Sequence, residues 1–223
     1  MTKLFFVRHG KTKWNLEGRY QGAGGDSPLL PGSYQDVSRL ATYLLSKKIK
    51  FRAIYTSPLL RAKTTAVFLS ENLNQKNLPI RVETGLREFN LGVMEGKTFK
   101  EVEAKFPAAV DAFRHHPDLF EENEVQAETF SELILRMRQV ILMIVKSYPK
   151  DSDHILIVSH GAALTALMQS LIGTPLADLR KNGGLTNTSL TVLETKDQGQ
   201  HFKKLQWNET SFLGKNLDKT DSI

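Results

Sequence analysis

Residues 4–10 read Leu-Phe-Phe-Val-Arg-His-Gly, and residues 155–161 read Ile-Leu-Ile-Val-Ser-His-Gly. In both stretches four apolar residues, which are typical of a short buried strand, lead through one polar residue to a His-Gly pair. Ligands of open α/β sheets bind beyond the carboxyl ends of the strands. If the two strands are neighbours in one sheet, His9 and His160 meet in the same crevice, and we expect a functional site there.

Strands and helices alternate along the rest of the chain, which predicts an α/β fold. The longest predicted helix has Thr129 and Glu132 at the spacing of a capping box, and the Ser57-Pro58 pair is typical of a helix start. We expect a single domain with a mostly parallel central sheet and helices on both faces. The apolar periodicity gives helices over residues 33–48, 57–73, 129–148 and 161–172, and further strands over 51–56, 188–193 and 202–207.

Two segments do not fit this alternation. Residues 107–127 are irregular and contain the acidic residues Glu121, Glu122 and Glu124, so we expect a lid or insertion beside the sheet rather than a part of the core. Residues 214–223 are polar and are expected to form a loose C-terminal tail. The domain itself is then expected to cover residues 1–213, a size that one α/β domain can reach.

The composition restricts the class of function. The chain has 40% hydrophobic and 24% charged residues, which is ordinary for a soluble globular protein. It has no cysteine, which excludes disulfides, thiolate metal sites and cysteine nucleophiles. Its net charge of +6 comes from scattered lysines and arginines rather than from the basic stripe of a nucleic-acid binder. No apolar run is long enough for a signal peptide or a membrane span, so we expect a cytoplasmic protein without membrane or nucleic-acid partners.

Four motifs gather residue types that suit phosphoryl chemistry. Imidazole is a nucleophile near pH 7, and the planar guanidinium of arginine matches the oxygens of a phosphate. The motifs are Arg8-His9-Gly10 with Asn15 and Gly-Arg-Tyr-Gln-Gly at 18–22, Ser-Pro-Leu-Leu-Arg at 57–61, Leu-Arg-Glu-Phe at 86–89, and Ser-His-Gly at 159–161. Taken singly, each has an ordinary explanation, such as a surface arginine or a loop carboxylate. Taken together and in this order, they resemble the phosphatase branch of the histidine phosphatase superfamily over residues 3–193.

The resemblance implies a phosphoglycerate-mutase-like fold and a metal-independent phosphatase that needs no cofactor. His9 would accept the phosphoryl group as a phosphohistidine, and Glu88 would act as the general acid and then as the general base. His160, with the two motif arginines, would stabilise the charge on the transferring oxygens. The residues expected to bind the phosphate or the rest of the substrate are Arg8, Lys11, Asn15, Gln21, Gly22, Arg61, His160 and Gly161.

The sequence leaves the substrate open, beyond a small phosphorylated metabolite. Lys11 stands where the family usually has Glu or Gln, at the expected mouth of the pocket. A cofactor-dependent phosphoglycerate mutase is one alternative, but the segment between Glu88 and His160 is short for a mutase and the expected lid is acidic. A non-catalytic phospho-ligand binding module is another, although it would predict the loss of His9 or Glu88. The oligomeric state is open as well, with a homodimer among the alternatives.

Overall fold

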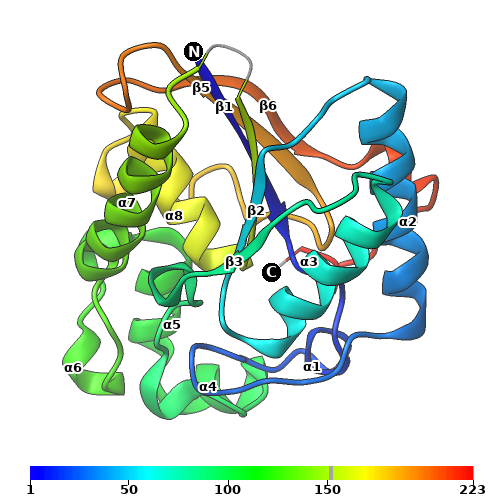
Figure 1. The fold of residues 1–223 in the computed structure, drawn as a ribbon. Helices are drawn as coiled ribbons and strands as arrows, with labels where there is room; N and C mark the ends of the chain where they lie inside the picture. The colour runs from blue at the N-terminus through cyan, green and yellow to red at the C-terminus, as the bar shows by residue number, and fades with distance from the viewer. Residues whose placement is uncertain (151–152, 223) are drawn as a thin grey trace.

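Six strands form one sheet in the part of the chain that the computed structural model describes, which is residues 1–150 and 153–222 (Figure 1). In the strand order β3-β2-β4-β1-β5-β6, the first four are mutually parallel, while β5 and β6 are antiparallel to their neighbours. The mostly parallel sheet expected from the sequence is therefore confirmed. The strands are β1 (Thr2–Arg8), β2 (Ala53–Thr56), β3 (Ile80–Val82), β4 (His154–Ser159), β5 (Leu190–Thr195) and β6 (Lys203–Glu209).

β1 and β4 are direct neighbours in the middle of the sheet. They pair in parallel with Arg8 opposite Ser159, so the two His-Gly pairs that follow these strands lie at the same edge. The four central residues of each strand are apolar because both faces of the strands are covered. Consecutive side chains of β1, such as Phe5 and Phe6, accordingly pack into different hydrophobic clusters on opposite faces of the sheet.

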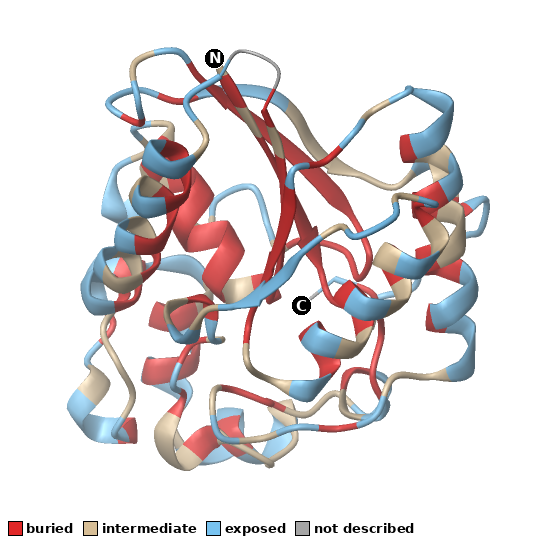
Figure 2. Cartoon of the chain, in the orientation of Figure 1, coloured by how far each residue is buried: buried red, intermediate tan, exposed pale blue. Residues whose placement is uncertain are grey.

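Helices cover both faces of the sheet and turn their buried sides toward it (Figures 1 and 2). α2 (Pro31–Ser46) and α3 (Leu60–Asn72) pack on one face, and α7 (Phe130–Ser147) and α8 (Gly161–Leu171) pack on the other. The capping box expected at the start of α7 is present, and it satisfies two backbone N–H groups that the helix itself leaves unpaired. The three-layer arrangement expected from the sequence is thus confirmed.

Shorter helices lie beyond the carboxyl ends of the parallel strands, at the lower end of Figure 1. They are α1 (Lys13–Leu16), α4 (Phe99–Lys105), α5 (Pro107–His115) and α6 (Glu122–Val125). Single turns of 3-10 helix complete the described chain: η1 (Thr84–Leu86), η2 (Gly92–Met94), η3 (Pro117–Leu119), η4 (Leu176–Asp178) and η5 (Ser211–Leu213). No helix within residues 1–150 or 153–222 has the length and apolar character that crossing a membrane requires.

α3 begins later than the sequence predicts. The Ser57-Pro58 pair indicates a helix with Ser57 as its N-cap, but the helix starts at Leu60, and the carboxylate of Asp26 accepts the backbone N–H of Leu60 at 2.6 Å. The Ser57 hydroxyl instead lies 2.7 Å from Nε2 of His160. The serine therefore contacts a histidine of the expected site, and it also accepts a weaker hydrogen bond of 3.3 Å from the backbone N–H of Leu59, just before the helix.

The segment expected to form a lid contributes to the hydrophobic core. Phe113 and Phe120 are buried and belong to the same cluster as the apolar faces of α7 and α8. Their ring centroids lie 5.2 and 6.1 Å from that of Phe89. The expectation that residues 107–127 lie outside the core is therefore wrong. A proline begins each of two short helical segments here, so the apolar side chains do not follow one helical period.

The C-terminal tail is packed near the end of β1 rather than loose. Asp221 is buried, and its backbone carbonyl accepts a hydrogen bond of 3.1 Å from Nη1 of Arg8. The Lys11 ammonium lies 3.0 Å from a carboxylate oxygen of Asp218 and 3.1 Å from one of Asp221. A polar composition predicts looseness, whereas these contacts depend on which residues meet in space. Ile223, the last residue of the expected tail, lies outside the described residues.

Candidate active site

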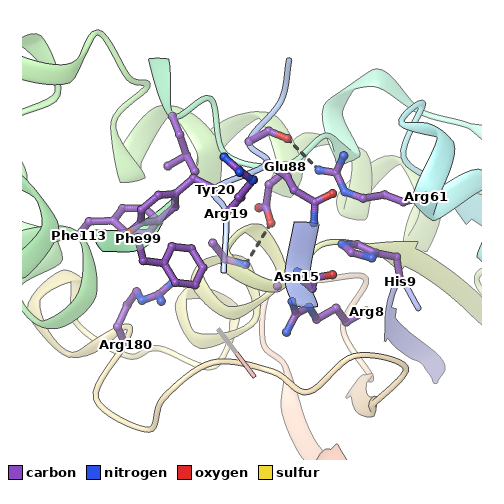
Figure 3. Close-up of a pocket in the computed structure, with 15 residues that line it drawn as sticks. Arg8, His9, Asn15, Arg19, Tyr20, Arg61, Glu88, Phe99, Phe113 and Arg180 are labelled. Carbon is purple, nitrogen blue, oxygen red and sulfur yellow. Dashed lines mark hydrogen bonds between the residues drawn. The ribbon is translucent and has the colours of Figure 1, made fainter. Parts of the chain in front are cut away.

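A cleft with about 490 Å³ of free space, its open mouth included, lies beyond the carboxyl ends of β1 and β4 (Figure 3). It brings together most of the site residues that the sequence predicts, which come from four separate motifs. The exceptions are His160, which lies beside the cleft, and Lys11. The lining residues are Arg8, His9, Asn15, Arg19, Tyr20, Gln21, Gly22, Arg61, Glu88, Leu91, Phe99, Phe113, Gly161, Ala162 and Arg180.

His9 is buried at the inner end of the cleft with a fixed ring orientation. Its Nδ1 atom lies 2.8 Å from the carbonyl oxygen of Gly10. Because a carbonyl oxygen only accepts hydrogen bonds, Nδ1 carries the proton and Nε2 keeps its lone pair. Burial, followed by the charges of Arg61 and Arg8, lowers the pKa of His9 well below its usual value. The ring is therefore neutral at pH 7, which is the nucleophilic form.

The second histidine lies next to the first. The ring centroids of His9 and His160 are 5.2 Å apart, as expected from the pairing of β1 with β4. His160 is fully buried, and its Nε2 atom contacts the hydroxyl of Ser57. Its Nδ1 atom has no hydrogen-bond partner among the described residues. Burial, followed by the charge of Arg61, lowers the pKa of His160 well below its usual value, so this ring is also neutral at pH 7.

Two buried arginines supply positive charge beside His9. Arg61 donates to the carbonyl oxygens of Gly22 and Gly25 at 2.8 and 2.7 Å, and it pairs with Asp26 at 3.1 Å. Arg8 donates through Nη1 to backbone carbonyls near the C-terminal tail. In both guanidinium groups the buried Nε–H has no partner among the described residues. Burial lowers the pKa of Arg8 to about 10, so the group stays charged at pH 7 and attracts an anion.

Two glycines of the predicted site make this packing possible. A Cβ atom at Gly161 would lie 3.0 Å from Nε of Arg8, so a larger residue would push the guanidinium away. Gly22 has a φ of +61°, and a Cβ atom there would lie 2.0 Å from the carboxylate of Glu95. Both glycines line the cleft. Because these two residues have no side chain, the backbone and the Arg8 guanidinium can lie close to a ligand bound in the cleft.

Glu88 is half-buried and lies at the start of α8. Its Oε1 atom accepts hydrogen bonds from the backbone N–H of Ala163 at 2.8 Å and of Phe89 at 2.9 Å. Arg136 donates to the backbone carbonyl of Glu88 at 3.0 Å, which fixes the loop that carries it. In Figure 3 the Glu88 side chain reaches into the cleft between His9 and the aromatic residues. A carboxyl group held in this way can exchange a proton with a group bound above His9.

The two amides of the predicted site are oriented by their oxygen atoms. Oδ1 of Asn15 accepts hydrogen bonds from the backbone N–H and the hydroxyl of Thr12 at 3.1 and 3.0 Å. Oε1 of Gln21 accepts one of 3.3 Å from the hydroxyl of Ser27. Because the amide oxygens of Asn15 and Gln21 already accept hydrogen bonds within the protein, their amide NH₂ groups are the parts that can donate to a ligand in the cleft.

Lys11 was expected to bind phosphate, and the structure does not bring it into the cleft. Its ammonium is paired with the two carboxylates of the tail, Asp218 and Asp221, and only 10% of its side chain is exposed. The residue that departs from the usual family pattern therefore anchors the tail that also contacts Arg8. Its contribution to the site is structural support.

Comparison with known proteins agrees with this geometry. The model of the histidine phosphatase superfamily, branch 1, matches residues 4–208. The chain belongs to this family. It is 31% identical over 212 residues to the glucosyl-3-phosphoglycerate phosphatase of Mycobacterium tuberculosis, covering 92% of this chain and 91% of the relative. It is 29% identical over 218 residues to a metal-independent phosphoserine phosphatase of Arabidopsis thaliana, covering 96% and 84%.

The structure of YhfR from Bacillus stearothermophilus is also similar, with a TM-score of 0.85 and 35% identity over 96% of this chain and all of that one (100%). The family resemblance and the phosphoglycerate-mutase-like fold expected from the sequence are therefore confirmed. With phosphatases among its relatives, this histidine phosphatase is an enzyme of the phosphoric monoester hydrolase class.

Several cleft residues of this histidine phosphatase are not identified by its sequence. Arg19 and Tyr20 lie within a quoted motif, but neither carries a predicted role. Phe99, Phe113 and Arg180 lie outside the motifs and reach the cleft only through tertiary packing. Within residues 1–150 and 153–222, no cluster of three or more histidine, aspartate or glutamate side chains is arranged to hold a metal ion.

Proposed function

We propose that this enzyme hydrolyses small phosphomonoesters through a phosphohistidine intermediate on His9, without a metal ion. The observation that carries the proposal is the orientation of the His9 ring. Its contact with the Gly10 carbonyl leaves Nε2 unprotonated, in the cleft that Arg8 and Arg61, each with an unpaired Nε–H, also line. A phosphoryl group bound to the two guanidinium groups would present its phosphorus atom to that nitrogen.

The first step transfers the phosphoryl group to the enzyme. His9 Nε2 attacks phosphorus as the bond from phosphorus to the leaving oxygen breaks, and Glu88 in its protonated form gives that oxygen a proton. The substrate alcohol then leaves. Arg8 and Arg61 stabilise the charge on the phosphoryl oxygens, which is the main requirement of such a transfer. The amide of Asn15 is placed to donate to the same group.

The second step restores the enzyme. Glu88, now a carboxylate, takes a proton from a water molecule whose oxygen attacks phosphorus. The bond between phosphorus and Nε2 breaks, inorganic phosphate leaves, and His9 returns to its neutral form. The low pKa of the His9 ring favours this return because the leaving nitrogen is a weak base.

Removal of metal ions is expected to leave the activity unchanged within about twofold, because Arg8 and Arg61 supply the positive charge that a metal ion supplies in other phosphatases. The measurement is the hydrolysis of p-nitrophenyl phosphate after exhaustive dialysis against EDTA. The same assay after addition of Mg²⁺ or Zn²⁺ is the control. Loss of activity on chelation with recovery on adding either ion would refute metal independence.

Release of inorganic phosphate is expected to exceed phosphoglycerate mutase activity. A mutase has to retain a doubly phosphorylated intermediate away from water, which requires cations over the phosphohistidine. Besides Arg8 and Arg61 the cleft is lined by Arg19 and Arg180, but segment 107–127 adds Arg114 as its one basic residue besides two histidines, and Lys11 is paired with the tail. The enzyme is incubated with 3-phosphoglycerate and catalytic 2,3-bisphosphoglycerate, and both 2-phosphoglycerate and free phosphate are measured. Rapid isomerisation with negligible free phosphate would favour the mutase instead.

A further inference from the structure

The outer part of the cleft has no role in the proposed transfer. It is formed by Arg180 together with the rings of Tyr20, Phe99 and Phe113. Figure 3 shows Arg180 and these rings on one side of Glu88, with His9, Arg8 and Arg61 on the other. These side chains come from widely separated segments, and the fold assembles them into one wall.

Arg180 is held in place without using its hydrogen-bond donors. Its guanidinium carbon lies 5.0 Å from the centre of the Phe113 ring, which restrains the group. Its Nε and Nη1 atoms are buried and have no hydrogen-bond partner within residues 1–150 and 153–222. Burial lowers the pKa of Arg180, and the carboxylate of Glu88 is the largest opposing influence. Arg180 and Glu88 both line the cleft.

A second unpaired donor lies in the same wall. Tyr20 is only 5% exposed, and its hydroxyl lies near the guanidinium of Arg114 but makes no hydrogen bond of normal geometry among the described residues, so its O–H remains free to donate. Burying polar groups without partners costs free energy, and buried polar groups of proteins are nearly always satisfied. Two different side chains, Tyr20 and Arg180, thus present unpaired donors to one cleft. That arrangement suits a ligand that carries its own oxygen atoms.

We propose that Arg180 and Tyr20 form a subsite for a carboxylate on the alcohol part of the substrate, so that the enzyme prefers phosphorylated hydroxy acids. This inference rests on the proposed function, in which Glu88 protonates the leaving oxygen. The phosphoryl group then occupies the side of Glu88 near His9, and the alcohol extends to the opposite side, where Arg180 lies. A planar carboxylate matches the donors of a planar guanidinium better than a sugar hydroxyl does.

The test compares pairs of substrates that differ in the carboxylate. 3-Phosphoglycerate is paired with glycerol 3-phosphate, and O-phosphoserine with O-phosphoethanolamine. Fructose 1,6-bisphosphate, paired with fructose 6-phosphate, is the arm in which a second phosphate replaces the carboxylate. We expect kcat/KM to favour the carboxylate member of the first two pairs by about 10- to 100-fold, the effect of one charge-assisted interaction.

Substitution of the arginine is expected to remove that preference. Arg180→Gln should reduce the ratio of kcat/KM within each carboxylate pair by about 10- to 100-fold, with the larger part in KM, and Arg180→Lys should restore part of it. Lys181→Gln is the matched control. It removes the same charge from the next residue in the chain, whose side chain is 73% exposed. Equal losses on both members of a pair would overturn the proposal, as would a stronger preference for the bisphosphate.

A binding measurement separates this inference from the proposed function. Titration calorimetry of His9→Ala protein, with and without Arg180→Gln, gives the affinity for 3-phosphoglycerate and glycerol 3-phosphate in the absence of turnover. Tighter binding of 3-phosphoglycerate that depends on Arg180 would support the subsite. It would do so even if the unsubstituted enzyme hydrolysed no substrate, because absence of hydrolysis would refute only the phosphatase mechanism. Equal affinities would refute the subsite, whatever the enzyme hydrolyses.

Discussion

Replacement of His9 by alanine is expected to lower kcat on p-nitrophenyl phosphate by at least about a thousand-fold, because the variant lacks the group that accepts the phosphoryl group in the proposed mechanism. The reason is geometric. Nε2 of His9 is held unprotonated by the contact of Nδ1 with the Gly10 carbonyl. Steady-state turnover gives the loss. Rapid quenching should also trap an acid-labile, alkali-stable phosphoryl group on the unsubstituted enzyme and none on the variant.

The control for this substitution is His115→Ala. His115 is an exposed histidine paired with Asp111 outside the cleft, so its replacement should change neither turnover nor the trapped phosphoryl group. Circular dichroism and thermal unfolding should show that His9→Ala remains folded. Near-normal turnover by folded His9→Ala protein would rule out the phosphohistidine mechanism.

Replacement of Glu88 by glutamine is expected to affect substrates according to their leaving group. A general acid is needed most when the departing alcohol is a poor leaving group, and its loss typically costs about 10² to 10⁴ in rate. Hydrolysis of an alkyl phosphate such as glycerol 3-phosphate should fall within that range. Hydrolysis of p-nitrophenyl phosphate should fall by less than about tenfold in the phosphorylation step, because nitrophenolate leaves without a proton. Pre-steady-state release of nitrophenol isolates that step.

The matched control is Glu95→Gln. Glu95 accepts hydrogen bonds from the backbone N–H groups of Ala23, Gly24 and Leu91 at 2.9 to 3.0 Å, but it does not line the cleft. This variant should lose stability, and any loss of activity should be the same for alkyl and aryl substrates. If Glu88→Gln also showed equal losses on both, Glu88 would be a structural residue and another acid would have to be sought.

The inner end of the site is predictable from the sequence because its signals are local. Apolar runs of strand length lead directly into His9 and His160, and the rule for the carboxyl ends of parallel strands places both at one edge. The pairing of β1 with β4 then brings the rings to 5.2 Å. The four long helices are predictable for the same reason, as the unbroken helical period and capping box of α7 illustrate.

The outer part of the cleft is not predictable in this way. Arg180 follows a single turn of 3-10 helix in a segment without a motif, and its ring partner Phe113 belongs to α5. The partners of Lys11 lie in a polar tail whose composition carries no sign of them. Strand β3 is missed because it has three residues, Ile-Arg-Val, a run too short to establish a period, and all three are exposed. Each of these features depends on contacts between distant segments, which no local pattern encodes.

The position of β1 also determines when the active centre can form. Lys3 of this strand pairs with His154 of β4 on one side and with Glu194 of β5 on the other. Contacts between residues so far apart in the chain form slowly, because a long loop has to close before they contribute any stability. During synthesis β1 has no neighbour from the described sheet until β4 leaves the ribosome, and its apolar residues are available to other chains until then. Arg8 and His9 are thus among the first site residues to be translated, and they reach their places in the sheet only when β4 and β5 have been made.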